Sequence, residues 1–511
     1  MARPHGHQPA ELRRLALATV FPGFDGTTPP AWLLELAAEG LGGAVLFGRN
    51  VDPDGGDDAV REMTGRLHDA GPHLLVAVDE EGGDVTRLDV ATGSTFPGSA
   101  ALGAVDDVDL TRDVATALGA RLRGVGVDLN LGPVADLELD PRNPTVGVRA
   151  FGAEAQLVAR HVAAFVAGQQ SAGVGAAVKH FPGHGATDED SHVTVPTVTS
   201  SRELLEAREL VPFRAALEVG AQVVMTAHIR LPALDPDLPA TLSPAVVDGL
   251  LRRELGFAGV VMTDGMDMHA ISRTVGHEEG AVLALLAGVD ALCLGGDSTD
   301  RALVERVVAA VVRAVTDGRI PYGRLAEAVG RLDRLVAWSR RPVPPVPVDD
   351  EAGRRAAARA IVSGGRVALT ADPLVLELED EPSIAAGQVP WGVGTPLRRR
   401  WPGTVVVTVH EDGPDPVRVA TSHAARPLVV ALRATRRRAW QREAVAALRA
   451  LRPDLVVVDH DLPSGPDVLG DRYVLTYGSS LVGAEAAADL LTAGRGAGGP
   501  AGTARTAAAP A

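Results

Sequence analysis

Short apolar runs alternate with longer amphipathic stretches up to about Trp338. The apolar runs have the length and composition of buried strands. There are eight of them: Leu15–Phe24, Gly42–Phe47, Leu74–Gly83, Val127–Asp136, Gly175–Phe181, Ala221–Ile229, Gly259–Asp267 and Ala291–Gly296. Between them, apolar residues recur with a helical period at Asp109–Arg123, Gly152–Ala172, Ser201–Val219 and Glu278–Ala287. This alternation predicts an α/β fold of the TIM-type (β/α)8 barrel class.

Polar side chains stand at the ends of several of these predicted strands. They are Asp79, Asp136, Lys179 with His180, His228 and Asp264. A barrel gathers its catalytic groups where strands run into the following loops, whereas an open doubly wound sheet gathers them at one or two crevices. The distribution therefore favours the barrel and predicts a site at the carboxyl ends of its strands.

A proline-rich segment, RRPVPPVPVDDE at Arg340–Glu351, interrupts the pattern. Proline excludes ordinary helix and favours an extended connection, so we expect a domain boundary there. Beyond it we expect strands at Pro373–Glu379, Thr404–Val409, Pro427–Arg433, Asp454–His460 and Asp471–Gly478, and helices at Ala352–Ser363, Trp440–Leu451 and Gly483–Leu491. The predicted organisation is a catalytic barrel domain (1–339), a linker (340–351), a smaller three-layer α/β sandwich domain (352–492) and a disordered tail (493–511).

Composition and charge limit the classes of binding partner that the protein can have. The 511 residues are 46% hydrophobic, so each domain can bury a large core. A formal charge of -16 argues against nucleic acid or an anionic membrane and fits a neutral or mixed-charge small molecule better. The one cysteine, Cys293, excludes intramolecular disulfides and cysteine-only metal clusters. No apolar run is long enough to span a bilayer, and we expect a cytoplasmic protein.

The densest group of proton-carrying side chains lies in the loop AAVKHFPGHGATDEDSHVTVP, residues 176–196. Its candidate residues are His180, His184, Asp188, Asp190 and His192. In the D-S-H triplet, Asp190 could hold the ring of His192 so that it transfers protons. The same five residues also offer enough nitrogen and oxygen ligands for zinc or manganese. A third interpretation is that the histidines have a purely structural role.

Three further positions carry candidate chemistry. Asp264 ends an apolar run, where it could be a fixed nucleophile or could merely cap the next helix. Asp79 and Arg87 flank the glycines of VDEEGGDVTRL, an arrangement common in polyol binding, although Glu80 and Glu81 could be solvated turn residues. Arg149 lies among small and apolar residues, so we expect a ligand or a buried carboxylate to pair with it.

Four stretches together resemble a known family. They are VDEEGGDVTRL (78–88), GVDLNLGPVADLELDPRNPTVGVRAFG (126–152), KHFPGHG…DSH (179–192) and GFAGVVMTDGMDM (256–268). Their order and spacing are similar to those of the bacterial β-N-acetylglucosaminidases of glycoside hydrolase family 3, over most of Leu15–Trp338. The end of the chain resembles the second domain of two-domain members.

The resemblance implies roles for individual residues. Asp264 would be the catalytic nucleophile, His192 the general acid/base and Asp190 its orienting partner. Substrate-binding residues would hold the N-acetylglucosamine: Asp79, Arg87, Arg149, Lys179 and His180. No metal or other cofactor is implied. The expected substrates are small carbohydrates, namely N-acetylglucosaminides such as muropeptide fragments of peptidoglycan recycling.

The expected reaction is retaining exo-hydrolysis through a covalent glycosyl-Asp264 intermediate. A histidine acid/base leaves no negative charge after deprotonation, so phosphate could compete with water and make the enzyme a phosphorylase. A β-glucosidase of the same family is another alternative. From other classes, a metal-dependent hydrolase and a non-catalytic sugar-binding protein also remain open.

Overall fold

The computed structural model describes residues 8–295, 300–347, 349, 351–381 and 383–494, together with the backbone of 505–506. The chain forms two compact units. The first consists of Met1–Glu80, Thr111–Asn143 and Ala153–Val348, and the second of Glu81–Leu110, Pro144–Gly152 and Asp349–Ala511.

The strands of the first unit follow one another in barrel order. β2 (Gly43–Leu46), β3 (Leu75–Val78), β4 (Leu129–Asn130), β5 (Gly175–Phe181), β6 (Val223–Thr226) and β9 (Val260–Thr263) form a six-stranded parallel sheet. β10 (Leu292–Gly295) pairs with β1 (Val20–Pro22), and a bridge from Met262 to Ala291 joins this pair to β9. β1 also contacts β2, although the two strands are assigned to different sheets. All eight predicted strands are present, and the predicted α/β barrel class is confirmed.

The barrel interior is filled by alternate apolar residues of these strands. Phe21, Val45, Ala77, Leu129 and Met262 belong to one buried cluster. Because successive strand residues point to opposite faces, this cluster fixes which residues at each strand end face the barrel mouth. Packing of the alternate apolar residues therefore sets the direction of the polar side chains that follow the strands.

The first predicted strand is partly wrong. Leu15–Leu17 belongs to helix α1 (Pro9–Leu17), and only Val20–Pro22 is extended. The helix begins with a proline in its first turn and buries Leu12, Leu15 and Leu17. A helix with one apolar face and a short buried strand merge into a single apolar run, which explains the error.

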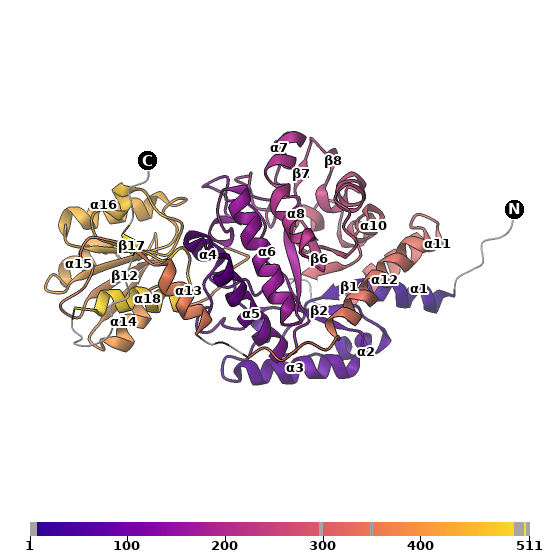
Figure 1. Ribbon diagram of the computed structural model, residues 1–511, viewed down its shortest axis with the longest axis horizontal. Coiled ribbons are helices and arrows are strands. Elements are labelled where there is room, and N and C mark those ends of the chain that lie inside the picture. Colours follow the sequence, from indigo (N-terminus) through magenta and orange to yellow (C-terminus); the bar gives the residue numbers. More distant parts are fainter. Residues whose placement is uncertain are drawn as a thin grey trace. The chain divides into compact units, whose positions relative to one another are not determined.

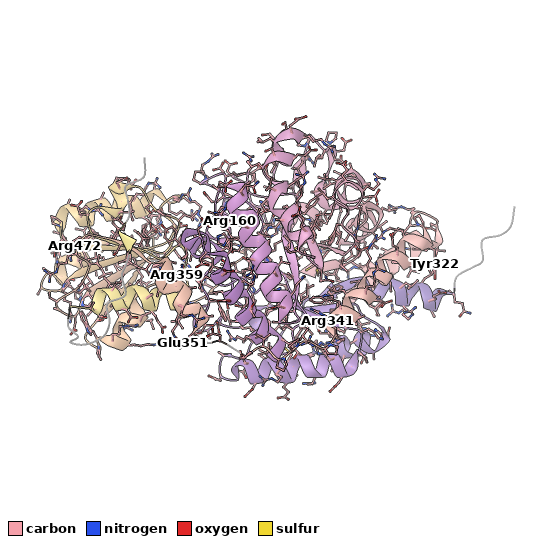
Figure 2. The ribbon with its side chains drawn as sticks, in the orientation of Figure 1. Arg160, Tyr322, Arg341, Glu351, Arg359 and Arg472 are labelled. Atoms are coloured by element: carbon pink, nitrogen blue, oxygen red, sulfur yellow. The ribbon has the colours of Figure 1, made fainter. Side chains whose placement is uncertain are left out.

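Helices surround the strands of the first unit (Figure 1). They are α2 (Ala31–Glu39), α3 (Gly56–Ala70), α5 (Val108–Gly124, in this unit from Thr111), α6 (Ala155–Ser171), α7 (Arg202–Ala207), α8 (Leu210–Glu218), α9 (His269–Ser272), α10 (His277–Ala287), α11 (Arg301–Thr316) and α12 (Tyr322–Ser339), with a π-helical segment at Ala245–Glu254 and a hairpin of β7 (Arg230–Leu231) and β8 (Asp235–Pro239). The hydroxyl of Tyr322 donates to Glu11 of α1 over 2.7 Å, which ties the last helix to the first (Figure 2).

The second unit has a sheet covered on both faces. Its strand order is β13 (Val405–Val409), β12 (Leu374–Leu378), β14 (Leu428–Leu432), β15 (Val456–Asp459), β16 (Tyr473–Leu475), β11 (Val362–Gly364) and β17 (Arg505–Thr506). β11 runs antiparallel to β16, and the strands from β13 to β16 are parallel. This is the predicted α/β sandwich.

Separate apolar clusters lie on the two faces of this sheet. α15 (Pro416–Ser422) and α16 (Ala439–Leu451) cover one face, and α13 (Ala352–Ala360), α14 (Gly394–Arg400) and α18 (Leu481–Thr492) the other (Figure 1), while the short α17 (Pro466–Leu469) follows β15. The predicted helix Ala352–Ser363 ends at Ala360, because Val362 and Ser363 pair with β16 as part of β11. The predicted disordered tail lies mostly outside the described residues.

The second unit also includes two stretches from the middle of the barrel sequence. They contain α4 (Ser99–Val105) and the 3-10 turn Gly147–Arg149. The amide of Leu481 donates to the carbonyl of Ser94 over 2.9 Å. Gly353 of α13 approaches so closely that a Cβ there would lie 2.0 Å from the carbonyl oxygen of Thr95. Arg359 of α13 pairs with Asp107 at 2.7 Å (Figure 2). The sequence pattern assigns both stretches to the barrel domain (1–339), whereas in the structure they belong to the second unit.

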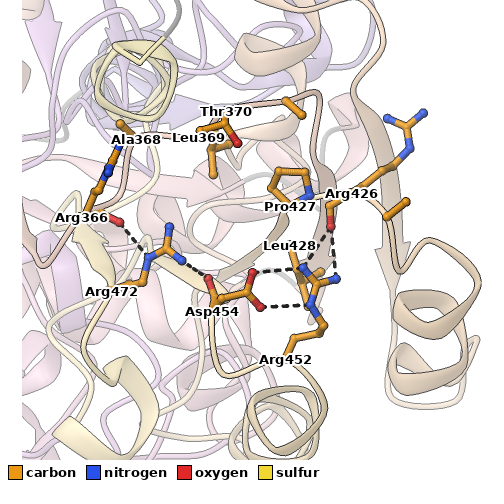
Figure 3. Close-up of a pocket in the computed structure, with 12 residues that line it drawn as sticks. Arg366, Ala368, Leu369, Thr370, Arg426, Pro427, Leu428, Arg452, Asp454 and Arg472 are labelled. Carbon is orange, nitrogen blue, oxygen red and sulfur yellow. Dashed lines mark hydrogen bonds and ion pairs between the residues drawn. The ribbon is translucent and has the colours of Figure 1, made fainter.

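A pocket of about 550 Å³ opens near the amino ends of β14, β15 and β16 (Figure 3). Two of its arginines are engaged by the protein itself: Arg452 pairs with Asp454 at 3.0 Å, and Arg472 donates to the carbonyl of Arg366 over 2.7 Å. These contacts tie the strand starts together. Among the described helices, none combines the length and apolar composition needed to cross a membrane.

Candidate active site

Asp264 follows β9 directly, at the carboxyl end of the strand. Its amide donates to the carbonyl of Thr226, and its Oδ1 accepts the amide of Gly265 over 2.8 Å. Burial would raise the pKa of this carboxyl, but the charges of His180, His228 and His192 outweigh it and lower the pKa to about 2. Asp264 is therefore an anion at neutral pH, with its main chain held by the sheet and three histidines close enough for their charges to act on it.

His228 supports the main chain just beyond this carboxylate. Its ring is buried, and Nε2 lies 2.9 Å from the carbonyl oxygen of Gly265. A carbonyl can only accept, so Nε2 carries the proton. Nδ1 lies 2.8 Å from the hydroxyl of Thr241, and burial holds the pKa of the ring below its usual range. His228 thus fixes the turn after Asp264.

Lys179 and His180, at the end of β5, each pair with a carboxylate from a neighbouring strand end. The Lys179 ammonium, almost fully buried, lies 2.6 Å from Asp79. His180 places Nδ1 2.6 Å from Oδ2 of Asp136. Because a carboxylate accepts, Nδ1 carries the proton in this hydrogen bond. Both side chains are fixed before any ligand binds.

Asp136 organises the start of the loop that follows β5. Besides His180 it accepts the amide of His184 over 2.7 Å. Burial would raise the pKa of Asp136, but the charge and hydrogen bond of His180 and the amide of His184 lower it below the usual range. The ring of His184 is buried, which lowers its pKa, and Nε2 lies 3.2 Å from the hydroxyl of Ser191. His184 thus connects the loop base to its tip.

At the loop tip, Asp190 and His192 form a compact pair. Oδ1 of Asp190 lies 2.9 Å from the amide of His192 and 2.7 Å from its Nδ1. Burial opposes ionisation of Asp190, but the hydrogen bonds and charge of His192 lower its pKa below the usual range. Nδ1 must donate to this carboxylate, so Nε2 is the ring nitrogen that would exchange a proton with a ligand. His192 also lies close enough to Asp264 for its charge to lower that pKa.

The five residues first considered as metal ligands divide into separate pairs. His180 binds Asp136, His184 contacts Ser191, His192 binds Asp190, and Asp188 pairs with Arg142 at 2.9 Å. Over the described part of the chain, no group of three or more His, Cys, Asp or Glu side chains has the geometry to hold a metal ion. The arrangement fits proton transfer.

The other two predicted sugar ligands, Arg87 and Arg149, belong to the second unit. Arg149 pairs with Glu81 through two bonds of 2.9 and 2.7 Å, with both side chains buried. Arg87 donates to the carbonyls of Ala385 (2.7 Å) and Ala386 (3.0 Å). The expected buried carboxylate for Arg149 is therefore Glu81. The alternative of solvated turn residues is wrong, because Glu80 and Glu81 are both buried.

The model of the glycosyl hydrolase family 3 N-terminal domain matches residues 32–335. The chain belongs to glycosyl hydrolase family 3. The match covers the strands that carry Asp79, Lys179 and Asp264, and it confirms the resemblance read from the four motifs. Family 3 membership also confirms the prediction of a glycoside hydrolase.

Several proteins are similar to this family 3 chain. A β-hexosaminidase of Nitrosomonas eutropha is 36% identical over 53% of this chain and 78% of its own length. β-Hexosaminidase A of Pseudoalteromonas piscicida is 32% identical over 60% of this chain, but the chain spans only 55% of that relative. The solved structure of a family 3 β-N-acetylglucosaminidase from Paenibacillus sp. str. FPU-7 matches with a TM-score of 0.84, at 32% identity, over 94% of this chain and 96% of that one.

The sequence motifs did not assign three supporting residues of this family 3 site. Asp136 and His228 were visible as polar residues at strand ends, but their partners His180 and Gly265 could not be read from the sequence. Glu81 was visible only as one of two adjacent acids. Each of them acts by fixing a neighbour, and such a role depends on contacts between strands rather than on a motif.

Proposed function

We propose that this protein is a retaining exo-β-N-acetylglucosaminidase that removes terminal β-linked N-acetylglucosamine. The observation that carries the proposal is that an ionised Asp264 lies within range of the charge of His192, which is itself hydrogen-bonded to Asp190. One group is a ready nucleophile, and the other is a proton carrier that would act through Nε2. These are the two functions that a double-displacement glycosidase needs.

In the first step, Asp264 attacks the anomeric carbon while His192 Nε2–H gives its proton to the leaving oxygen. The glycosidic bond breaks, and a glycosyl ester forms on Asp264. In the second step, neutral His192 takes a proton from water, and the hydroxide displaces Asp264. The sugar leaves with its β configuration, and both side chains return to their starting protonation states.

The names of similar proteins support the sugar specificity. The Paenibacillus structure is titled a β-N-acetylglucosaminidase, and the curated relatives are called β-hexosaminidases. Lys179 with Asp79, and His180 with Asp136, offer fixed donors and acceptors for sugar hydroxyls. We further propose that the substrates are muropeptide fragments from peptidoglycan recycling.

A leaving-group series tests the two roles separately. His192→Ala should lose activity strongly on an alkyl N-acetylglucosaminide and much less on a 2,4-dinitrophenyl glycoside, because an acidic phenol leaves without a proton. Asp264→Ala should lose activity on both. Equal losses for His192→Ala across the series would contradict its role as the acid, and normal turnover in Asp264→Ala would contradict the nucleophile.

A further inference from the structure

The pocket shown in Figure 3 lies where β14, β15 and β16 begin, and all of its lining residues belong to the second unit. Its charged lining consists of four arginines and one acid: Arg366, Arg426, Arg452, Arg472 and Asp454. Four positive charges against one negative charge leave a formal charge of +3, in a chain whose formal charge is -16. A local excess of this sign attracts anions.

Arg452 is the arginine of this pocket that pairs with a carboxylate in the described part of the chain. It donates from Nε to Oδ1 of Asp454 over 3.0 Å and from Nη2 to Oδ2 over 3.2 Å. The hydrogen bond from Arg452 holds the pKa of Asp454 below its usual range, so this carboxyl is an anion at neutral pH. Arg452 and Asp454 therefore cancel each other's charge.

Two of the other arginines are held by main-chain carbonyls. Arg472 donates from Nε to the carbonyl of Arg366 over 2.7 Å and from Nη1 to the carbonyl of Asp454. Arg426 donates from Nη1 to the carbonyl of Gly403 over 2.7 Å. A carbonyl group carries no net charge, so it orients a guanidinium without cancelling its charge. Both side chains keep a full positive charge in a fixed position.

Arg366 has no such anchor. Across the described residues, no group accepts a hydrogen bond from its guanidinium, and the side chain is exposed. Its main-chain carbonyl holds Arg472, and the two arginines lie on one side of the pocket, while Arg426 lies on the other side in this view (Figure 3). The exposed hydroxyl of Thr370 lines the same pocket. Guanidinium groups and a hydroxyl are donors that suit the oxygens of a phosphate.

The remaining lining of the pocket is apolar. It consists of six residues: Ala368, Leu369, Ala371, Ala425, Pro427 and Leu428. An inorganic phosphate ion would use the polar donors alone, whereas the organic part of a phosphate ester would also cover apolar surface. The volume of about 550 Å³ is large enough for a small organic molecule.

We infer that this pocket binds a phosphate group, with Arg366 and Arg472 donating to its oxygens. The net charge favours phosphate over a carboxylate, because three guanidinium groups without a carboxylate partner suit an anion whose charge at neutral pH is close to -2. The ligand is inorganic phosphate or a small phosphate ester, which share this chemistry. The site uses none of the residues assigned to glycoside hydrolysis, so it does not depend on the proposed function.

Isothermal titration calorimetry of the full chain tests the site. Inorganic phosphate, phenyl phosphate and acetate are titrated at equal ionic strength and about pH 7.5, where phosphate is mostly a dianion. Both phosphate compounds should bind saturably with one site per chain, and acetate should bind more weakly. Tighter binding of phenyl phosphate would identify a phosphate ester as the ligand, and equal affinities would identify inorganic phosphate. No saturable binding of either compound, or acetate binding as tightly, would overturn the inference.

Arg366→Gln is the decisive variant, because its side chain has no hydrogen-bond partner among the described residues and the fold does not depend on it. Its melting temperature without phosphate should equal the parent's, and its phosphate affinity should fall by about tenfold, which corresponds to one charge-assisted hydrogen bond. Arg418→Gln is the matched control, since Arg418 is an exposed arginine in α15 of the same unit, and it should bind phosphate as the parent does. The parent's affinity in Arg366→Gln, or an equal loss in Arg418→Gln, would contradict the assigned site.

Discussion

Replacing Asp190 with asparagine removes one negative charge from the Asp190–His192 pair and changes little else in shape. In the parent, Oδ1 of Asp190 accepts from both the amide and the Nδ1 of His192, at 2.9 and 2.7 Å. The two side chains are only 18% and 22% exposed, so solvent screens the pair weakly. A hydrogen bond to a charged group is worth about 1.5 to 3 kcal/mol. Since 1.36 kcal/mol corresponds to one pH unit, the change amounts to about 1 to 2 pH units.

The direction follows from the role of His192 as acid. Asp190 stabilises the protonated ring, and the same coupling lowers its own pKa. Without the carboxylate, His192 loses its proton at lower pH. The alkaline limb of kcat/KM for an aryl N-acetylglucosaminide should therefore move down by about 1 to 2 pH units in Asp190→Asn. The assay is a pH–rate profile for parent and variant between about pH 4 and about pH 10.

Glu189→Gln is the control, because it removes a charge from the adjacent, exposed position of the same loop. Its alkaline limb should stay within about 0.3 pH units of the parent, since surface charges contribute little. An Asp190→Asn profile with the parent's alkaline limb would refute the coupling between the two residues. A uniform fall in rate at every pH would show that Asp190 holds geometry alone.

Two further predictions concern the pH dependence of stability and the fate of phosphate. Burial and the charge of Asp459 raise the pKa of Asp461 to about 7. This carboxyl group therefore ionises more readily in the unfolded chain, and the free energy of unfolding falls as the pH rises from about 4 to above 7. Asp461→Asn should thus match the parent's thermal stability near pH 4 and exceed it near pH 8, by an unfolding free energy of up to about 4 kcal/mol; equal melting curves at both pH values would contradict this. In phosphate buffer, hydrolysis predicts free N-acetylglucosamine as the product; N-acetylglucosamine 1-phosphate as the main product would instead identify a phosphorylase.

Much of the barrel could be predicted because buried parallel strands leave a simple signal. Gly175–Phe181 is observed with the predicted bounds, and polar residues such as Asp264 follow the strands as expected. The same signal failed at Leu15–Leu17, where the apolar face of a helix runs directly into a strand. A run of buried residues alone does not separate the two structures.

The contacts that fix the site could not be read from the sequence, because they join residues far apart in the chain. Arg149 was expected to need a carboxylate, yet only the fold shows that this is Glu81, 68 positions away. The hydrogen bonds from Arg87 to Ala385 and Ala386 span almost 300 positions. Motifs identify which groups carry the chemistry, and long-range packing decides what holds them.

Trapping the glycosyl-enzyme tests the central claim most directly. A 5-fluoro N-acetylglucosaminyl fluoride slows both steps of the reaction. The covalent intermediate breaks down more slowly than it forms, so it accumulates. Peptide mapping by mass spectrometry should place one sugar on the peptide that contains Asp264, and Asp264→Ala should take up no label. A sugar attached to another residue, or an enzyme that turns over the inhibitor with no covalent adduct at any time, would contradict the assignment of Asp264 as the nucleophile.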